Sequence, residues 1–212
     1  MKNALFLLPM LAVGFLYSCS ERVLRVENGS VHHADGATTP IPHWNEAGWT
    51  HLFFVRHADK AVVSDPQPAD PPGVPLSQEG MARAGRLGEI LKHANLDLVF
   101  STRHEGTDYI RTKTTADSVR IHYRNTAASL STYPSPTTRE GSETWLANVL
   151  QNNRGGRILV VGHSNSLPQM LQILDANPLF ASPGWELNSF KDFFVVAYNG
   201  NRAESKTKML WY

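Results

Sequence analysis

The sequence has one cysteine, Cys19, among its 212 residues. A single copy of the chain therefore cannot form an internal disulfide or a zinc site built from cysteines. Neither sign of charge is in excess, because 20 lysines and arginines stand against 19 aspartates and glutamates. This balance argues against a protein that binds nucleic acid through bulk positive charge. A hydrophobic content of 42% likewise argues against a disordered chain.

Two glycine-rich motifs are also missing, the G-x-G-x-x-G fingerprint and the GxxxxGK[ST] loop. Their absence argues against a Rossmann dinucleotide site and a nucleoside-triphosphate site. The uncharged stretch at residues 4–17 is shorter than the roughly 20 residues that a membrane-spanning helix needs. Because Lys2 precedes it, this stretch predicts the apolar region of a secretory signal.

The signal-like segment ends in Leu16-Tyr17-Ser18-Cys19, which resembles a bacterial lipoprotein signal. The resemblance implies cleavage before Cys19 and lipidation of its thiol. The alternative is an ordinary signal peptide in which Cys19 is incidental. An unpaired thiol would be a liability in an oxidising compartment, which favours lipidation. We therefore expect an exported protein, attached to the cell envelope by lipid alone.

Three regions are predicted: a signal peptide at residues 1–18, a lipid-anchored tether at 19–48, and one domain at 49–212. Turn signals and prolines interrupt the tether, so we expect little regular structure beyond one short strand at residues 22–27. We interpret its adjacent histidines, His32 and His33, as loop residues and expect no metal site.

From residue 50 onward, short apolar runs alternate with segments of helical spacing. The pattern predicts an α/β domain, a three-layer sandwich whose mainly parallel sheet carries helices on both faces. The expected strands are residues 52–55, 96–100, 121–123, 157–161, 193–198 and 206–212. The expected helices are residues 77–94, 108–119, 142–152 and 166–174, and residues 124–141 are expected to form a loop.

Two histidines stand just after predicted buried strands. His57 follows residues 52–55, and His163 follows residues 157–161. Side chains just past the carboxyl ends of neighbouring parallel strands converge on one crevice. The sequence therefore predicts that the two imidazoles share one site.

Three short motifs resemble those of the histidine phosphatase superfamily, also called phosphoglycerate mutase-like. They are Arg56-His57-Ala58, Arg111-Thr112-x-x-Thr115-Ala116 and Gly162-His163-Ser164-Asn165. Each motif alone is weak, but three in this order on the expected elements are specific. The resemblance covers residues 50–212 and implies a phosphoglycerate mutase-like fold. It also implies a phosphatase that uses no metal and no other cofactor.

The resemblance implies a role for each motif residue. His57 would attack phosphorus through Nε2 and carry the phosphoryl group, which water then removes. Arg56 and Arg111 would grip the phosphoryl oxygens with planar guanidinium groups. His163 would donate to the same oxygens as charge develops on them. The residues expected to help bind substrate beside His163 are Ser164 and Asn165.

The sequence leaves two assignments undecided, the second phosphate-binding arginine and the general acid. The pair Ser101-Thr102 lies further before Arg111 than the superfamily pattern has it, so residues 103–110 are expected to form an extended loop. Arg103 is thus an alternative second arginine, and His104 could edge the pocket. The candidates for the acid are Glu140 and Glu143, with Asp59 and Asp108 as fallbacks. A mechanism without an acid, acting on an activated phosphate, is the remaining possibility.

Two other functions compete with a phosphatase of the cell envelope. One is a non-catalytic phosphate-binding protein that retains the pocket. The other is a phosphoglycerate mutase, which export from the cytoplasm disfavours. In each case the expected partner is a phosphorylated small molecule, not a nucleic acid, and the sequence leaves the substrate and the oligomeric state open.

Overall fold

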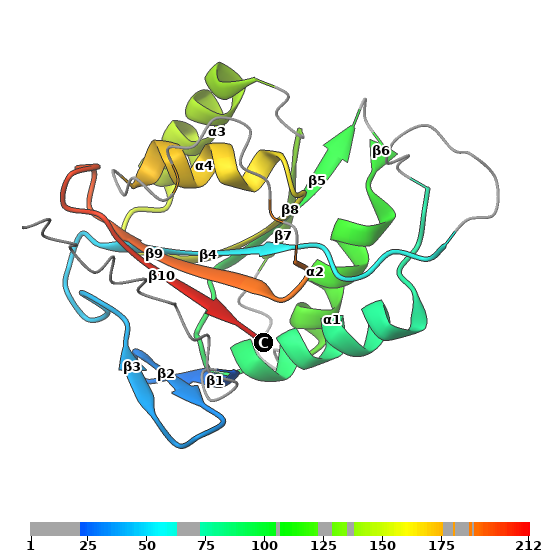
Figure 1. Cartoon of the computed structure of the whole chain (residues 1–212). Helices are drawn as coiled ribbons and strands as arrows, with labels where there is room; N and C mark the ends of the chain where they lie inside the picture. The colour runs from blue at the N-terminus through cyan, green and yellow to red at the C-terminus, as the bar shows by residue number, and fades with distance from the viewer. Residues whose placement is uncertain are drawn as a thin grey trace, which may run out of the picture.

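A computed structural model describes residues 22–62, 73–104, 107–122, 129–134, 138–175, 180, 187 and 189–212. Within these residues, a seven-stranded sheet carries helices on both faces (Figure 1). The strand order is β10-β9-β4-β8-β5-β6, and β7 also pairs with β5. The strands are β4 (Thr50–Arg56), β5 (Leu98–His104), β6 (Thr107–Asp108), β7 (Ser129–Pro134), β8 (Arg157–Gly162), β9 (Asp192–Tyr198) and β10 (Lys206–Trp211). The helices are α1 (Gln78–Leu91), α2 (Ile110–His122), α3 (Arg139–Asn152) and α4 (Ser166–Leu174).

The arrangement confirms the predicted three-layer α/β class. Strands β4, β8, β5 and β7 pair in parallel, whereas β9, β10 and the short β6 pair antiparallel with their neighbours. Strands β4 and β8 are buried almost throughout, as their continuous apolar sequences predict. Parallel strands place their carboxyl ends at one edge of the sheet, and both histidines stand at that edge.

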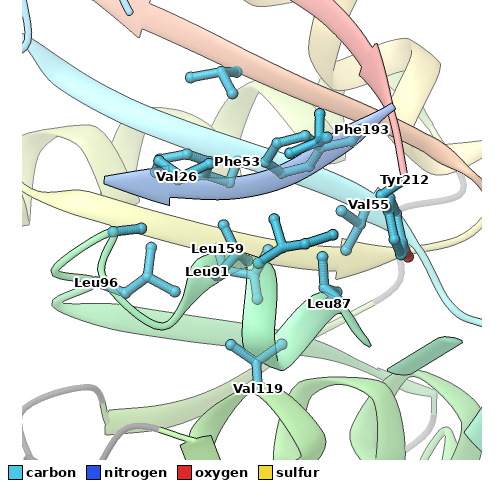
Figure 2. Close-up of a cluster of buried hydrophobic side chains, with 14 of the residues drawn as sticks. Val26, Phe53, Val55, Leu87, Leu91, Leu96, Val119, Leu159, Phe193 and Tyr212 are labelled. Carbon is cyan, nitrogen blue, oxygen red and sulfur yellow. The ribbon is translucent and has the colours of Figure 1, made fainter. Parts of the chain in front are cut away.

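Two apolar clusters fill the spaces on either side of the sheet. One joins α1 and α2 to the sheet and includes Phe53, Leu91 and Phe193 (Figure 2). The other lies under α3 and α4 and includes Leu146 and Met170. Strands β4 and β8 are central in the strand order and contribute side chains to both clusters. The site therefore stands on strands that are closely packed on both faces.

Residues 22–48 have more regular structure than the predicted tether, whose one expected strand, at residues 22–27, is β1. They contain a three-stranded antiparallel sheet of β1 (Val23–Glu27), β2 (Ser30–His33) and β3 (Thr38–Pro40). Val26 and Trp44, from this segment, belong to the same buried cluster as Phe53 and Leu91, and Figure 2 shows Val26 beside Phe53. The segment therefore continues the folded domain, whose first described residue is Arg22.

A tight turn explains this difference. Asn28 and Gly29 both have positive φ angles, 51° and 76°, and join β1 to β2. Asn-Gly in this conformation is the preferred two-residue hairpin connection, so the pair belongs to a hairpin. A side chain at Gly29 would also meet the Trp44 ring at 2.6 Å.

Two further secondary-structure predictions were wrong. Residues 129–134, within the predicted loop, form β7, which pairs in parallel with β5. Residues 121 and 122, predicted to start a strand, belong to α2 instead. The remaining predicted strands and helices are confirmed, with boundaries that differ by a few residues.

Candidate active site

The two histidines lie together at the carboxyl edge of the sheet. Arg56 at the end of β4 is in register with Gly162 at the end of β8, and the His57 amide donates to the Gly162 carbonyl at 2.9 Å. The imidazole centroids of His57 and His163 are 5.3 Å apart, with the rings at 68°. The structure thus brings together the two side chains that the sequence predicts to share a site.

His57 is buried and has a defined tautomer. Its side chain is 1% exposed, and Nδ1 lies 2.7 Å from the carbonyl oxygen of Ala58. A carbonyl can only accept, so Nδ1 carries the hydrogen and Nε2 keeps its lone pair. Burial lowers the pKa of His57 to about 3, against the Ala58 hydrogen bond and with smaller contributions from His163, Arg111 and Arg56. His57 is therefore a neutral imidazole with a free nucleophilic nitrogen at physiological pH.

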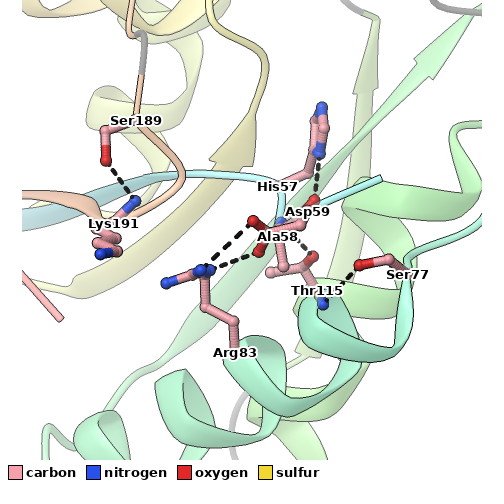
Figure 3. Close-up of polar contacts among 9 residues, drawn as sticks. His57, Ala58, Asp59, Ser77, Arg83, Thr115, Ser189 and Lys191 are labelled. Atoms are coloured by element: carbon pink, nitrogen blue, oxygen red, sulfur yellow. Dashed lines mark hydrogen bonds and ion pairs between the residues drawn. The ribbon is translucent and has the colours of Figure 1, made fainter. Parts of the chain in front are cut away.

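The loop after His57 is held by neighbouring helices (Figure 3). Thr115 of α2 donates to the Arg111 carbonyl at 2.8 Å and accepts from the Ala58 amide at 3.1 Å. The amide of Ser77, the N-cap of α1, donates to the Asp59 carbonyl at 2.9 Å. A Cβ atom at Gly80 would lie 2.1 Å from that same oxygen, so glycine lets α1 approach the loop.

The two predicted arginines have different backbone partners. Arg111 is fully buried, and its Nη1 donates to the Val74 carbonyl at 3.4 Å. Arg56 is half-buried, donates from Nη1 to the Leu187 carbonyl at 2.8 Å, and lies 4.1 Å from the Phe190 ring centroid. Both guanidinium groups are close enough to His57 to disfavour its protonation. Two positive charges therefore lie near His57, which suits an anionic ligand.

The extended segment before Arg111 is a β-hairpin. Arg103 of β5 pairs with Asp108 of β6, and their side chains form an exposed ion pair at 3.0 Å. Arg111 begins the first turn of α2 directly after this hairpin. The hairpin accommodates the additional residues, so Arg111, and not Arg103, is the buried arginine beside His57.

His163 is held by hydroxyl groups. Its Nε2 lies 2.9 Å from Oγ1 of Thr102, which lies 2.8 Å from Oγ1 of Thr112. Thr112 donates its one hydroxyl hydrogen to the Tyr109 carbonyl at 3.1 Å. Thr102 must then donate to Thr112, and it accepts the hydrogen of His163 Nε2. His163 thus carries a hydrogen on the nitrogen that is bare in His57.

The other predicted residues of the second-histidine motif have structural contacts. The His163 amide donates to Oγ of Ser166 at 3.3 Å, which fixes the turn into α4. The Ser164 carbonyl accepts from the Leu187 amide at 3.0 Å, and exposed Asn165 is the N-cap of α4. Within the described residues, neither the Ser164 nor the Asn165 side chain contacts His57 or His163.

The predicted acids are not in contact with the histidines. Glu140 and Glu143 are exposed near the start of α3, and Glu143 pairs with Arg139 at 2.8 Å. Glu140 instead lines a separate surface hollow beside Trp145. In the described part of the chain, neither carboxylate makes a hydrogen bond or an ion pair with the histidine pair.

The fallback acids are engaged by other arginines. Both carboxylate oxygens of Asp59 accept hydrogen bonds from Arg83. Burial alone would raise the pKa of Asp59, but these bonds, with its own backbone, leave that pKa lowered. Asp108 pairs with Arg103 at 3.0 Å.

The positions of Cys19 and of the His104 side chain lie outside what the structure describes.

Three contacts of the site had no role in the sequence prediction. The Tyr109 and His163 ring centroids are 4.5 Å apart, the Phe190 and His57 centroids are 5.6 Å apart, and Thr102 bonds His163. Of these three residues, only Thr102 carried a signal in the sequence, its position at a strand end. The contacts of Tyr109 and Phe190 depend on tertiary packing, which no short motif encodes.

The described residues show neither a metal cluster nor a membrane-spanning helix. Across these segments, no three His, Cys, Asp or Glu side chains gather as a metal site. None of the helices described has the length and apolarity needed to cross a bilayer.

The fold can be compared with solved structures. The protein histidine phosphatase SixA complexed with tungstate is 14% identical, with a TM-score of 0.52, covering 76% of this chain and 96% of that one. For the alpha-ribazole phosphatase from Shigella flexneri the identity is 15%, the TM-score 0.55, and the coverage 76% and 96%. A mycobacterial glucosyl-3-phosphoglycerate phosphatase is 12% identical, with a TM-score of 0.56 and coverage of 77% and 98%.

These structures are members of the histidine phosphatase superfamily. No protein-family model matches the sequence. The search of curated proteins also found no relative. At these identities the comparison concerns fold, and the fold of this chain is phosphoglycerate mutase-like.

Proposed function

We propose that this protein is a phosphatase that hydrolyses phosphomonoesters through a phosphohistidine on His57. The observation that carries the proposal is the buried, neutral His57, whose Nδ1 is held by Ala58 and whose neighbours include Arg56, Arg111 and His163. A neutral Nε2 is a nucleophile, and the surrounding positive groups match the charge of a phosphoryl group.

The proposed reaction has two displacements. In the first, the Nε2 lone pair of His57 forms a bond to phosphorus, and the phosphorus–oxygen bond of the ester breaks. The leaving alcohol keeps that electron pair and takes a proton. In the second, water attacks the phosphohistidine, inorganic phosphate leaves, and His57 returns to its neutral form. Arg56 and Arg111 stabilise the equatorial oxygens in both steps. His163 is the proposed third donor, and its Nε2 hydrogen bond passes from Thr102 to a phosphoryl oxygen when substrate binds.

The fold comparisons support this reading. Proteins with the same fold are described as phosphatases of protein histidine, alpha-ribazole phosphate and glucosyl-3-phosphoglycerate. One of them is complexed with tungstate, an oxyanion of phosphate-like shape. Their different substrates leave the substrate of this chain to be argued from its own residues.

A phosphate-binding protein without turnover is the second candidate. It is favoured by the lack of contact between the described carboxylates and the histidines, since protonation of a leaving group contributes about 10²–10⁴ in rate. Hydrolysis of p-nitrophenyl phosphate in the presence of EDTA separates the two functions. A phosphatase of the proposed kind turns over and loses turnover in His57→Ala. A binding protein retains affinity for phosphate and releases no phenol.

We keep Glu140 and Glu143 as the proposed sources of a leaving-group proton. A carboxylate that supplies this proton matters more for an alkyl ester than for p-nitrophenyl phosphate. Glu140→Gln and Glu143→Gln should therefore be compared on both substrates. A selective loss on the alkyl ester identifies the donor, and equal small effects exclude both residues.

We also propose that lipid on Cys19 anchors the protein in the bacterial cell envelope. Arg22 is three residues beyond Cys19, so the lipid would hold the folded domain within about 10 Å of the bilayer. Wild-type protein should fractionate with membranes and incorporate labelled fatty acid, and Cys19→Ala should do neither. Recovery of unlabelled wild-type protein entirely in the soluble fraction would refute the anchor.

A further inference from the structure

The four aromatic rings of the site lie in a defined order. The ring contacts of the described residues join Tyr109 to His163, His163 to His57, and His57 to Phe190. Their centroid separations are 4.5, 5.3 and 5.6 Å in that order. Tyr109 and Phe190 therefore flank the histidine pair from opposite ends.

The Phe190 ring is already engaged by the arginine of the site. The guanidinium carbon of Arg56 lies 4.1 Å from the centroid of the Phe190 ring. The Phe190 and His57 ring centroids are 5.6 Å apart, and the two rings are tilted by 49°. A cation over an aromatic face is attracted by the ring quadrupole. Phe190 thus contacts both Arg56 and His57.

Tyr109 lies at the other end of this row, against His163. In-line attack by His57 puts the leaving group on the side of phosphorus opposite Nε2. Of the rings that the structure describes, Tyr109 contacts His163, and His163 in turn contacts His57. Its side chain is half-buried.

The backbone of Tyr109 is tightly held by the hairpin. Its amide donates to the Thr102 carbonyl at 3.1 Å, and its carbonyl accepts from Lys113 N at 2.9 Å and from Thr112 Oγ1 at 3.1 Å. The Arg103–Asp108 pair ties the two strands of the hairpin together. A ring fixed in this way offers a preorganised surface for another ring.

We propose that the β5–β6 hairpin is a specificity element and that Tyr109 receives the planar ring of an aryl phosphomonoester. This inference rests on the proposed phosphatase function and names its substrate class. Aryl esters also suit the candidate acids, since Asp59, Asp108 and Glu143 are each paired with an arginine and Glu140 lines a separate hollow. A phenol is a better leaving group than an alkanol and needs less help from an acid.

Binding of non-hydrolysable phosphonates tests the proposal without turnover. Benzylphosphonate reproduces phenyl phosphate with carbon in place of the ester oxygen, and cyclohexylmethylphosphonate replaces its flat ring with a puckered one of similar size. Calorimetric titration of the wild type should give an affinity for the benzyl compound about 3- to 10-fold higher than for the cyclohexyl compound. Tyr109→Leu should remove this preference, and Tyr109→Phe should keep it.

Phe190→Leu is the matched control, because it removes a ring from the other end of the row. It should weaken both phosphonates equally and leave their ratio unchanged. A wild-type ratio near one, or a ratio that survives in Tyr109→Leu, overturns the proposal. Failure to bind either phosphonate overturns it as well. Phenyl phosphate turnover, measured in parallel, tests the phosphatase function separately, since a chain that hydrolyses alkyl and aryl esters equally keeps that function and loses this inference.

Discussion

His57 and His163 stand at the ends of adjacent parallel strands, but their surroundings differ. His57 is fixed by a backbone carbonyl, which can only accept, and by a loop that Thr115 holds against α2. His163 is fixed by the hydroxyl of Thr102, which can accept or donate. The two Nε2 atoms consequently differ: that of His57 keeps its lone pair, and that of His163 carries a hydrogen. Similar strand ends thus suit the different roles proposed for the two histidines, nucleophile and hydrogen-bond donor.

Removing each histidine should separate these roles most strongly. His57→Ala should lower kcat by about 10⁴-fold or more, because the nucleophile is lost. His163→Ala should cost about 10²–10³-fold, the usual effect of losing one donor to a developing oxyanion. Steady-state kinetics with p-nitrophenyl phosphate measures both, and circular dichroism checks the fold. Equal losses in the two variants would contradict the division of roles.

The arginines provide the next comparison. Arg111→Lys keeps the charge but loses the planar fork, so kcat/KM should fall by about 10- to 100-fold. Arg103→Lys is the matched control, since Arg103 forms an exposed ion pair with Asp108, and kcat/KM should stay within about twofold of wild type. The reverse result would place Arg103 in the site and contradict the hairpin geometry.

Two threonines test the contrasting supports of the histidines. Thr102→Val removes the acceptor of the His163 Nε2 hydrogen and should lower kcat about tenfold. Because this N–H group is then buried without an acceptor, the free energy of unfolding should also fall, by about 1–3 kcal/mol. Thr115→Val leaves the Ala58 amide buried without its acceptor and should lower the free energy of unfolding by about 1–3 kcal/mol. Activity assays and urea denaturation distinguish the two. Identical profiles in both variants would show that the supports are not distinct.

The pH dependence of stability gives the smallest effect. The pKa of His57 falls from 6.5 to about 3 on folding, so the unfolded chain binds the extra proton between these values. Keeping His57 neutral therefore contributes to the free energy of unfolding. This contribution is fully present above pH 6.5 and is lost as the pH falls toward 3. Between pH 6.5 and 5.5, wild type should lose about 1 kcal/mol more than His57→Asn in urea denaturation. Parallel curves for the two proteins would contradict the lowered pKa.

Much of this site could be predicted from the sequence because its determinants are local. Continuous apolar runs predict β4 and β8 as buried strands, and a parallel sheet brings residues after those strands together. His57 and His163 could therefore be paired before the structure. The buried position of Arg111 needed the structure, because a hairpin before α2 compensates for the unusual spacing.

Other features depended on turn geometry and tertiary pairing. Asn28-Gly29 is one of the turn signals that interrupt residues 19–48 in the sequence, yet positive φ at both residues makes it a hairpin turn that lets β1 and β2 pack on the core. Strand β7 has the polar sequence SLSTYP, so its parallel pairing with β5 is absent from the hydrophobic pattern. The contact between Tyr109 and His163 likewise joins residues distant in sequence.

The most direct test of the account locates the phosphoryl group on the enzyme. Wild-type protein mixed with phenyl phosphate should be quenched in alkali within milliseconds, because phosphohistidine is stable to base, and its peptides analysed by mass spectrometry. The account predicts an acid-labile phosphoryl group on His57 that is absent in His57→Ala. A phosphoryl group on His163 or on any other residue, or continued turnover in His57→Ala, would contradict it.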